Sequence, residues 1–212
     1  MKLYSFFRSG SSHRARIVLN LKNIPYEFEY IALNKNEHLN HSFENINPQK
    51  FVPVLIDQDT IFIQSPAMIE WIEEKYPEPA LLPKELKEKA YVRAIAAMIG
   101  CDIHPINNKR VLEYLRHDLK LDEADIQKWC KNWIDQGFQA LESYIQQHDY
   151  SGQYCCGDSI TIAEAYLIPQ IDSAIRFGVE LNLYPKLVDI YQNCMKLEEF
   201  QKASPSKQLD AF

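Results

Sequence analysis

Three prolines within seven residues, from Pro77 to Pro83, divide this chain into two parts with different hydrophobic patterns. Because proline fixes φ and lacks a backbone N–H, such a run ends a helix and forms a stiff connection. The residues before it alternate between strand-like and helix-like segments, whereas the residues after it show only the helical period. We therefore expect an α/β domain over residues 1–78, a linker over residues 79–86 and an all-α domain over residues 87–212.

The first part has the pattern of a βαβ unit followed by a ββα unit. Residues 3–7 and 26–30 are strand-like, and residues 11–21 between them place apolar side chains at helical spacing. The connection between two such strands is expected to be a right-handed crossover. Residues 54–56 and 60–63 are two further apolar runs, and the three residues between them suit a hairpin. A helix is expected directly after this hairpin.

The second part contains four segments with the helical period, at residues 85–115, 123–147, 160–177 and 185–196. A chain of 212 residues in which 46% are hydrophobic is long enough to bury a core in each of two domains. No segment approaches the roughly 18 to 20 apolar residues that a membrane span needs, and the N-terminus lacks a signal-peptide core. We expect a cytoplasmic protein that does not contact a membrane.

Charge and cysteine usage exclude several classes of partner. The net charge of −6 argues against a nucleic-acid surface, because phosphate backbones are bound by clustered Lys and Arg side chains. The five cysteines have neither disulfide nor metal-site spacing, so we expect no metal. Basic side chains do cluster locally, and such islands in an acidic protein suit small anionic ligands. The two clusters are Arg8, Arg14 and Arg16, and Lys109 with Arg110.

The turn from Arg8 to Ser12 reads Arg-Ser-Gly-Ser-Ser and joins the first strand to the first helix. Folds of the α/β class usually bind ligands in the crevice at this position. The free N–H groups and positive dipole end of the helix would stabilise an anion, including a thiolate, and a serine hydroxyl would add a hydrogen bond. The other interpretation is that Ser9, Ser11 and Ser12 only cap the helix. The segment alone does not decide between the two.

Two later segments have a similar double interpretation. Pro53 stands directly before an apolar strand, and a cis Val52-Pro53 bond would leave the backbone N–H and C=O of Val52 to pair with an extended ligand. An ordinary trans bond is the alternative and has the higher base rate. Gln64 and Ser65 lie at the next helix start, with Ser65 expected at the N-cap and Pro66 at the first helical position. Ser65 would either bind a carboxylate or simply cap the helix.

The order of these features resembles the cytosolic glutathione transferases over nearly the whole chain. The resemblance is greatest to the zeta class, which includes bacterial maleylacetoacetate and maleylpyruvate isomerases. It is carried by residues 3–9 (Leu-Tyr-Ser-Phe-Phe-Arg-Ser), 47–53, 100–112 and 169–177. The resemblance implies a thioredoxin-like α/β N-terminal domain and an all-α C-terminal domain. It also implies glutathione as the cofactor and a homodimer as the assembly.

The resemblance further implies roles for individual positions. Ser9 would lie near the glutathione sulfur, with Ser11 and Ser12 at the same helix start. The tripeptide would be held by His38, Val52, Pro53, Gln64 and Ser65. The helical domain would close over the cofactor with His104, Asn108, Lys109 and Arg110. The carboxylates of a dicarboxylate substrate would be bound by Arg8, Arg110 and Arg176. The residues implied to be catalytic are Ser9, Ser11 and Arg8.

The reaction that the resemblance implies is cis–trans isomerisation of maleylacetoacetate or maleylpyruvate, a step in the catabolism of aromatic amino acids such as tyrosine and of aromatic acids. Many zeta-class sequences read Ser-Ser-Cys in the loop, whereas this chain reads Ser-Gly-Ser from Ser9 to Ser11, which puts cysteine-dependent side reactions in doubt. A transferase for small electrophiles such as α-haloacids is the main alternative. A non-enzymatic binding module is another. A thioredoxin-like redox role is disfavoured, because the turn lacks the C-x-x-C that such a role requires.

Overall fold

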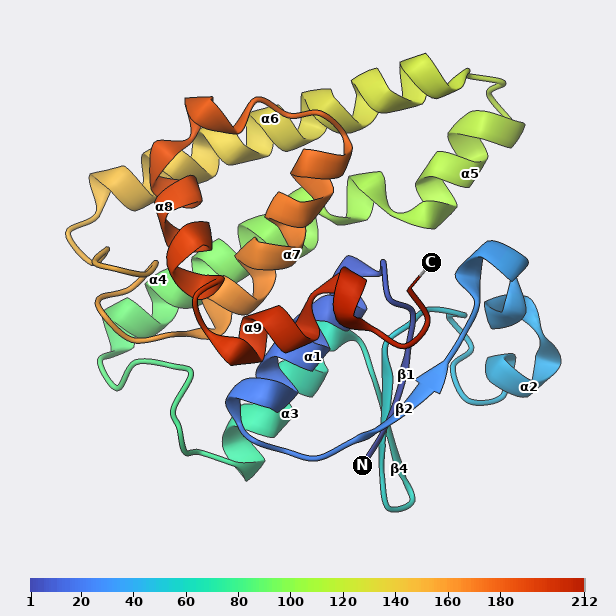
Figure 1. Cartoon of the computed structure of the whole chain (residues 1–212), viewed down its shortest axis with the longest axis horizontal. Coiled ribbons are helices and arrows are strands. Elements are labelled where there is room, and N and C mark those ends of the chain that lie inside the picture. The colour runs from blue at the N-terminus through green and yellow to red at the C-terminus, as the bar shows by residue number, and fades with distance from the viewer. Residues whose placement is uncertain (212) are drawn as a thin grey trace. The chain divides into compact units, whose positions relative to one another are not determined.

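The computed structural model describes residues 1–211, which pack into two compact units. The first unit contains residues 1–81 together with residues 195–211, and the second contains residues 82–194. The elements of both units are labelled in Figure 1. The expected helical domain over residues 87–212 therefore differs from the structure at its C-terminal end, because the last segment of the chain packs with the first unit.

The first unit contains a four-stranded sheet in the order β2-β1-β3-β4. Its strands are β1 (Lys2–Ser5), β2 (Glu27–Tyr30), β3 (Val54–Asp57) and β4 (Thr60–Ile63). β1 pairs in parallel with β2 and antiparallel with β3, which in turn pairs antiparallel with β4. Parallel strands need a crossover, and α1 (Gly10–Leu21) supplies it. This is the βαβ-ββ order that the sequence predicts, although β1 ends at Ser5 and not at residue 7.

Helices cover both faces of this sheet (Figure 1). α1 and α3 (Ser65–Lys75) lie side by side on one face, and α2 (His41–Glu44) lies on the other. α9 (Glu198–Ala203) packs against α1. The unit also contains the 3-10 turns η1 (Leu33–Lys35), η2 (Glu37–Leu39) and η6 (Pro205–Lys207). The unit is therefore an α/β/α sandwich to which the C-terminal segment is added.

The C-terminal segment belongs to the first unit because side chains of α1 bind its backbone. Asn20 Nδ2 donates to the Glu199 carbonyl at 3.0 Å, and Arg16 Nε donates to the Ala203 carbonyl at 2.9 Å. Arg16 is fully buried, so water does not compete for its bond. Because these contacts join residues far apart in the chain, the helical pattern of the segment alone cannot reveal them.

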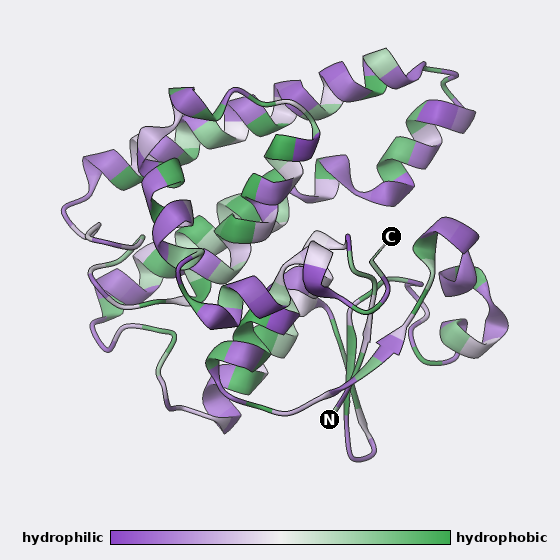
Figure 2. Ribbon diagram, viewed as in Figure 1, coloured by the Kyte–Doolittle hydropathy of each residue, from purple (hydrophilic) through white to green (hydrophobic). Residues whose placement is uncertain are grey.

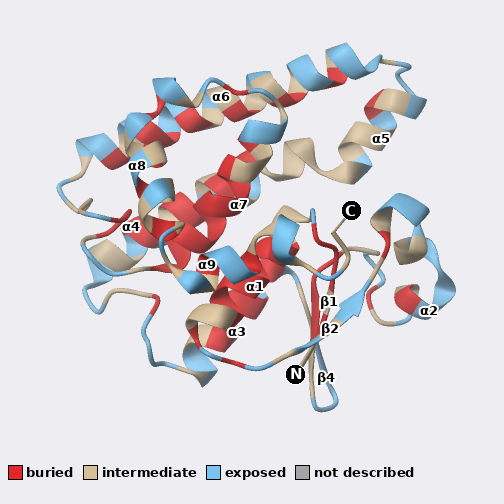
Figure 3. Ribbon diagram, viewed as in Figure 1, coloured by how far each residue is buried: buried red, intermediate tan, exposed pale blue. Residues whose placement is uncertain are grey.

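The second unit is an assembly of helices around α7 (Ile162–Arg176). The other helices are α4 (Leu86–Ala97), α5 (Lys109–His117), α6 (Glu123–Gln147) and α8 (Pro185–Cys194), with the 3-10 turn η5 (Leu181–Leu183) before α8. α7 contacts both α4 and α8, and Figure 3 shows that most of its length is buried. The outward side of α6 is exposed in Figure 3 and hydrophilic in Figure 2. Among the helices of residues 1–211, none is long and apolar enough to cross a membrane.

The single helix predicted over residues 85–115 is interrupted between α4 and α5. Two tight turns separate these helices, a π-helical turn at Met98–Ile103 and a 3-10 turn at Pro105–Asn107. Pro105 has no N–H with which to continue a helix. Asn108 then caps α5, because its Oδ1 accepts the Arg110 N–H at 3.3 Å. The interruption therefore determines where α5 and its basic first turn begin.

Candidate functional site

Ser9 is the N-cap of α1, so the capping interpretation of its turn holds. Its Oγ accepts the Ser12 N–H at 3.2 Å, and its carbonyl accepts the His13 N–H at 2.8 Å. Ser9 Oγ also lies 3.1 Å from Ser11 Oγ, which donates to the Val52 carbonyl at 3.0 Å. Since Ser11 has one hydroxyl hydrogen and gives it to Val52, Ser9 is the donor in the pair of hydroxyls. The result is a hydrogen-bonded chain from Ser9 through Ser11 to Val52.

The hydrogen bonds of Ser9 let it serve both as a helix cap and as a hydroxyl donor that can turn toward another acceptor. The cap uses an oxygen lone pair of Ser9 and leaves its hydroxyl hydrogen available. An anion beside Ser9 can therefore take this hydrogen from Ser11 without loss of the cap. The first turn of α1 contains no acidic residue, so no side-chain charge there offsets the positive end of the helix dipole. Capping and anion binding are thus compatible at the same residue.

The register of the sheet brings three segments to one edge. Tyr4 pairs with Val54, and Val54 pairs with Ile63. Because β3 is antiparallel to both neighbours, the chain leaves β1, enters β3 and leaves β4 at the same end of the sheet. The three segments at this end carry Ser9, the Val52-Pro53 pair and the Gln64-Ser65 pair. The sheet register therefore brings to one edge three segments whose signals were ambiguous in the sequence.

The Val52-Pro53 peptide bond is cis, so the trans alternative is wrong. The turn before it is held by Asn47, which is 1% exposed, donates from Nδ2 to the Phe51 carbonyl at 2.8 Å and accepts the Gln49 N–H at 3.0 Å. Within residues 1–211 the N–H of Val52 makes no hydrogen bond, whereas its carbonyl accepts from Ser11. Val52 thus offers a backbone donor at this edge.

The start of α3 differs by one residue from the prediction. Gln64, not Ser65, is the N-cap, and it turns the chain from β4 into the helix with a φ of +67°. Its side chain does not cap the helix, since Nε2 donates to Gln49 Oε1 at 2.6 Å. Ser65 is buried as the first helical residue. The amide groups of the first turn remain oriented toward the helix start.

The predicted cluster of basic side chains around Arg8 lies only partly at the surface. Arg8 is exposed, whereas Arg14 and Arg16 are buried. The Arg16 guanidinium donates to the Phe7 carbonyl at 3.0 Å and to Ser5 Oγ at 3.1 Å. Arg16 therefore holds the end of β1 in place and is not a surface site for anions. This role of Arg16 was not predicted, since nothing in the local sequence pattern distinguishes a buried arginine from an exposed one.

Burial disfavours the charged forms of several titratable side chains in both units. Burial, with a smaller contribution from the charge of Arg16, holds the pKa of His13 well below its usual value. Burial raises the pKa of Cys130 and of Cys156 to about 11, and that of Cys155 well above its usual value. The turn itself contains no cysteine. The turn therefore offers hydroxyl groups and backbone amides but no thiol of its own.

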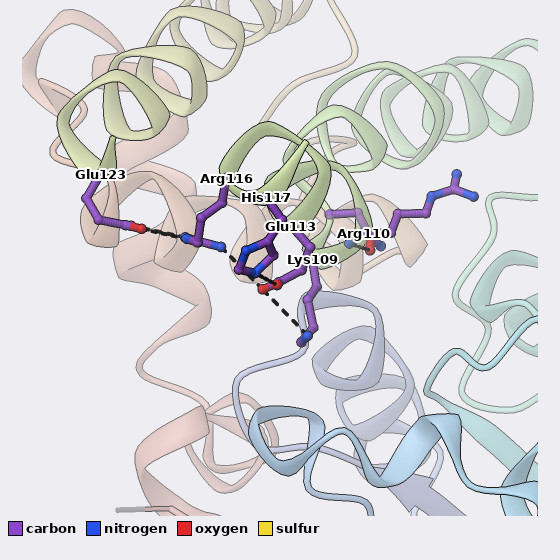
Figure 4. A network of polar contacts seen from close by, with 7 residues as sticks. Lys109, Arg110, Glu113, Arg116, His117 and Glu123 are labelled. Atoms are coloured by element: carbon purple, nitrogen blue, oxygen red, sulfur yellow. Dashed lines mark hydrogen bonds and ion pairs between the residues drawn. The ribbon is translucent and has the colours of Figure 1, made fainter. Parts of the chain in front are cut away.

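Four predicted residues of the second unit lie at or beside the start of α5: His104, Asn108, Lys109 and Arg110. Lys109 Nζ lies 3.6 Å from Glu113 Oε1, and the same oxygen accepts from Arg116 Nη1 at 3.2 Å. Figure 4 shows Lys109 directed toward Glu113, whereas the side chain of Arg110 extends away from this network. Arg110 is exposed, so it is the more accessible cation of the pair.

The network in Figure 4 also fixes α5 against α6. Arg116 donates from Nε and Nη2 to the two carboxylate oxygens of Glu123 at 2.6 and 3.0 Å. Neither Arg116 nor Glu123 was predicted to have a role. The spacing of Glu113 to Arg116 on one helix was a visible signal, but the pair between the two helices requires the fold.

Arg176 lies at the end of α7 and is exposed. Its Nη2 donates to Ser173 Oγ at 3.2 Å, and its guanidinium lies 4.8 Å from the centre of the Phe177 ring. Phe177 packs against an apolar cluster that contains Leu115 of α5 and Cys130 of α6. The same cluster therefore supports Arg176 and the helix that carries Arg110.

The predicted site residues fall into two sets. The first unit brings together Ser9, Ser11 and Val52 by hydrogen bonds and places Pro53, Gln64 and Ser65 at the same sheet edge. It also contains Arg8, Ser12 within α1 and His38 within η2. The second unit contains His104, Asn108, Lys109 and Arg110 near the start of α5, and Arg176 at the end of α7.

Comparison with known proteins gives consistent matches over the whole chain. Residues 3–80 match the family described as glutathione S-transferase, N-terminal domain. Over 211 residues the chain is 50% identical to a maleylpyruvate isomerase from Ralstonia sp, with 100% of both chains covered.

Two solved structures are similar to this protein in fold as well as in sequence. The holo structure of a maleylpyruvate isomerase, described as a bacterial glutathione S-transferase of the zeta class, has a TM-score of 0.99 at 50% identity, and 100% of both chains is covered. The maleylacetoacetate isomerase of Methylobacterium extorquens AM1, solved with bound malonate and glutathione, has a TM-score of 0.97 at 31% identity, also with 100% of both chains covered. With an α/β unit and a helical unit of this architecture, the chain belongs to the zeta class of the glutathione S-transferase family.

Proposed function

We propose that this protein is a glutathione-dependent cis–trans isomerase whose substrate is maleylpyruvate or the related acid maleylacetoacetate. The observation that carries the proposal is the series of hydrogen bonds from Ser9 through Ser11 to Val52 at the N-terminus of α1. The protein in which it occurs is 50% identical to a maleylpyruvate isomerase. Identity to the maleylacetoacetate isomerase from Pseudomonas aeruginosa is lower, at 39% over 213 residues. This difference favours maleylpyruvate as the first substrate to test.

The sheet edge of the first unit carries groups that would bind glutathione. The N–H of Val52 would pair with the extended backbone of the tripeptide, as in the addition of a strand. Gln64 and Ser65 at the start of α3 would bind a glutathione carboxylate, because helix N-termini favour anions. We retain His38, Pro53, His104, Asn108 and Lys109 as proposed cofactor contacts on the strength of the family resemblance.

Ser9 would stabilise glutathione as its thiolate. Its hydroxyl would turn from Ser11 to the sulfur, and the dipole of α1 would act in the same direction. Ser11 would remain bonded to the Val52 carbonyl and so keep that loop in place. Both effects favour the charged form of the thiol, so they lower its pKa.

The reaction proceeds by reversible addition. The thiolate forms a C–S bond to one alkene carbon, and the electron pair of the double bond moves onto the adjacent carbonyl as an enolate. The former double bond is now single and rotates. The enolate then collapses, the double bond re-forms in the trans arrangement, and the C–S bond breaks to return the thiolate. No atom is gained or lost, so glutathione is regenerated in each turnover.

The arginines would bind the carboxylates of the substrate and offset the enolate charge. The three proposed for this role are Arg8, Arg110 and Arg176. All three are exposed, and a guanidinium can bind a carboxylate through two parallel hydrogen bonds. Stabilisation of charge that develops in the transition state is often the largest contribution to catalysis.

The cellular setting follows from the same proposal. We infer a cytoplasmic protein, because its five cysteines are unpaired and a reducing compartment keeps both them and glutathione as thiols. The family resemblance supports a homodimer and a place in the catabolism of aromatic compounds such as tyrosine.

A panel of three substrates tests the proposed function. Maleylpyruvate, maleylacetoacetate and dichloroacetate are each assayed with and without glutathione. We expect the highest kcat/KM for maleylpyruvate, and no turnover above the uncatalysed rate without glutathione. A preference for dichloroacetate would instead establish a transferase for α-haloacids. If calorimetry detects no glutathione binding, the proposal is wrong and the alternative of a non-enzymatic binding module is the one to pursue.

A further inference from the structure

The C-terminal segment reaches the turn that carries Ser9. Asp210 Oδ2 accepts the N–H of Phe7 at 2.9 Å, although 203 residues separate the two in the chain. Ala211 packs against the apolar cluster that contains Phe6, Phe7 and Val52. The last residues of the described chain are therefore in contact with the segment between β1 and α1.

Phe7 is bound on both of its backbone polar groups. Its N–H donates to Asp210, and its carbonyl accepts from Arg16 Nη2 at 3.0 Å. The partners are an anionic and a cationic side chain, and hydrogen bonds to charged groups are stronger than neutral ones. Arg16 also donates to the Ala203 carbonyl, so the C-terminal segment is tied to this point through two separate bonds.

The position of Phe7 bears on two groups of the proposed active site. Ser9 follows two residues later, and its N–H donates to the Phe6 carbonyl at 3.0 Å. The Arg8 guanidinium lies 5.4 Å from the centre of the Phe7 ring. A shift of Phe7 therefore moves both the proposed thiolate donor and one proposed carboxylate ligand.

Asp210 makes this contact with one oxygen only. Its other carboxylate oxygen, Oδ1, is buried and has no hydrogen-bond partner within residues 1–211. A buried acceptor without a donor is unfavourable for stability. Within residues 1–211, the hydrogen bond of this side chain goes to the Phe7 N–H, in the segment that leads into the proposed active-site turn.

We propose that Asp210 is a positioning residue for Arg8 and Ser9, and that the C-terminal segment is a working part of the glutathione site. The proposal rests on the proposed function for the role of Ser9. Asp210 would not contact the reacting atoms. It would hold Phe7 so that the Ser9 hydroxyl keeps its direction, and small displacements of such groups are costly in rate.

Two variants of Asp210 and one neighbour test this role. In Asp210→Ala the hydrogen bond is lost, so we expect the thiol pKa of bound glutathione to rise and kcat/KM to fall, by about 100-fold if the displacement reaches about 1 Å. In Asp210→Asn the amide oxygen still accepts the Phe7 N–H, so both values should stay near those of the unaltered protein. Leu209→Ala is the matched control, because Leu209 is 94% exposed and should change neither value.

Hydrogen exchange provides a readout that is independent of substrate and cofactor. The amides of Phe7 and Ser9 should exchange faster in Asp210→Ala than in Asp210→Asn. If the alanine variant is less stable to heat but keeps the exchange rates, the thiol pKa and kcat/KM, the role is merely structural and the proposal is wrong. If the thiol pKa and kcat/KM change as much in Asp210→Asn as in Asp210→Ala, the hydrogen bond to Phe7 does not explain the effect and the proposal is wrong. If the unaltered protein shows no isomerase activity, the proposed function fails, but hydrogen exchange and thiol titration still decide the role of Asp210.

Discussion

Replacement of Ser9 by alanine is expected to raise the thiol pKa of bound glutathione and to lower kcat/KM by about 100-fold, the typical loss for one preorganised donor. The hydroxyl hydrogen of Ser9 is the one that can turn toward the sulfur, because the helix cap uses only the oxygen of this side chain. Thiolate absorbance against pH measures the pKa, and steady-state kinetics measures kcat/KM.

The controls separate this effect from loss of the helix cap. Removal of an N-cap hydroxyl costs about 1 kcal/mol of stability, so thermal unfolding is measured in parallel. Ser9→Thr keeps a hydroxyl for both tasks and should retain most of the activity. Ser206→Ala removes an exposed serine of η6 and should change neither the titration nor the kinetics. A thiol titration that is unchanged in Ser9→Ala would rule out the proposed role of Ser9.

Replacement of Arg176 by alanine should raise KM for the dicarboxylate substrate by roughly 10- to 100-fold, the range for loss of a charged hydrogen bond. KM for a neutral alkylating substrate should change little, because such a substrate has no carboxylate for the guanidinium to bind. Contacts with Ser173 and Phe177 hold the guanidinium at the end of α7. Steady-state kinetics on both substrates provides the comparison.

Two further variants make the comparison specific. Arg176→Lys keeps the charge but loses the two-point geometry, so its KM should lie between those of the alanine variant and the unaltered protein. Arg93→Ala removes an exposed arginine of α4 to which no substrate role is assigned, and its KM should stay unchanged. Equal losses on the acid and on the neutral substrate in Arg176→Ala would contradict the assignment.

Much of the fold was predictable because its signals are local. α6 spans residues 123–147, as its apolar period predicts, and the hairpin of β3 and β4 forms where two apolar runs are separated by three residues. The interruption before α5 was missed although Pro105 is visible in the sequence, because the apolar pattern continues on both sides of it. The N-cap of α3 was predicted one residue too late, because Gln64 adopts a positive φ that is not expected for a glutamine.

The site was predictable only in part, and the reason is the distance along the chain between partners. Ser9, Val52 and Ser65 each had a plain structural interpretation, and only sheet register places them at one edge. The burial of Arg16 could not be seen, because one of its partners lies 187 residues away. The contact of Asp210 with Phe7 spans 203 residues and gives no local signal.

In the proposed reaction, glutathione supplies the attacking thiolate and is returned unchanged. The most direct test is to count the trans isomer formed from maleylpyruvate when glutathione is present far below the substrate concentration, and to titrate the free thiol afterwards. We expect many turnovers per glutathione, an undiminished thiol at the end, and no turnover with S-methylglutathione, which lacks the thiol. Consumption of one glutathione per product, or equal turnover with S-methylglutathione, would contradict the proposed reaction.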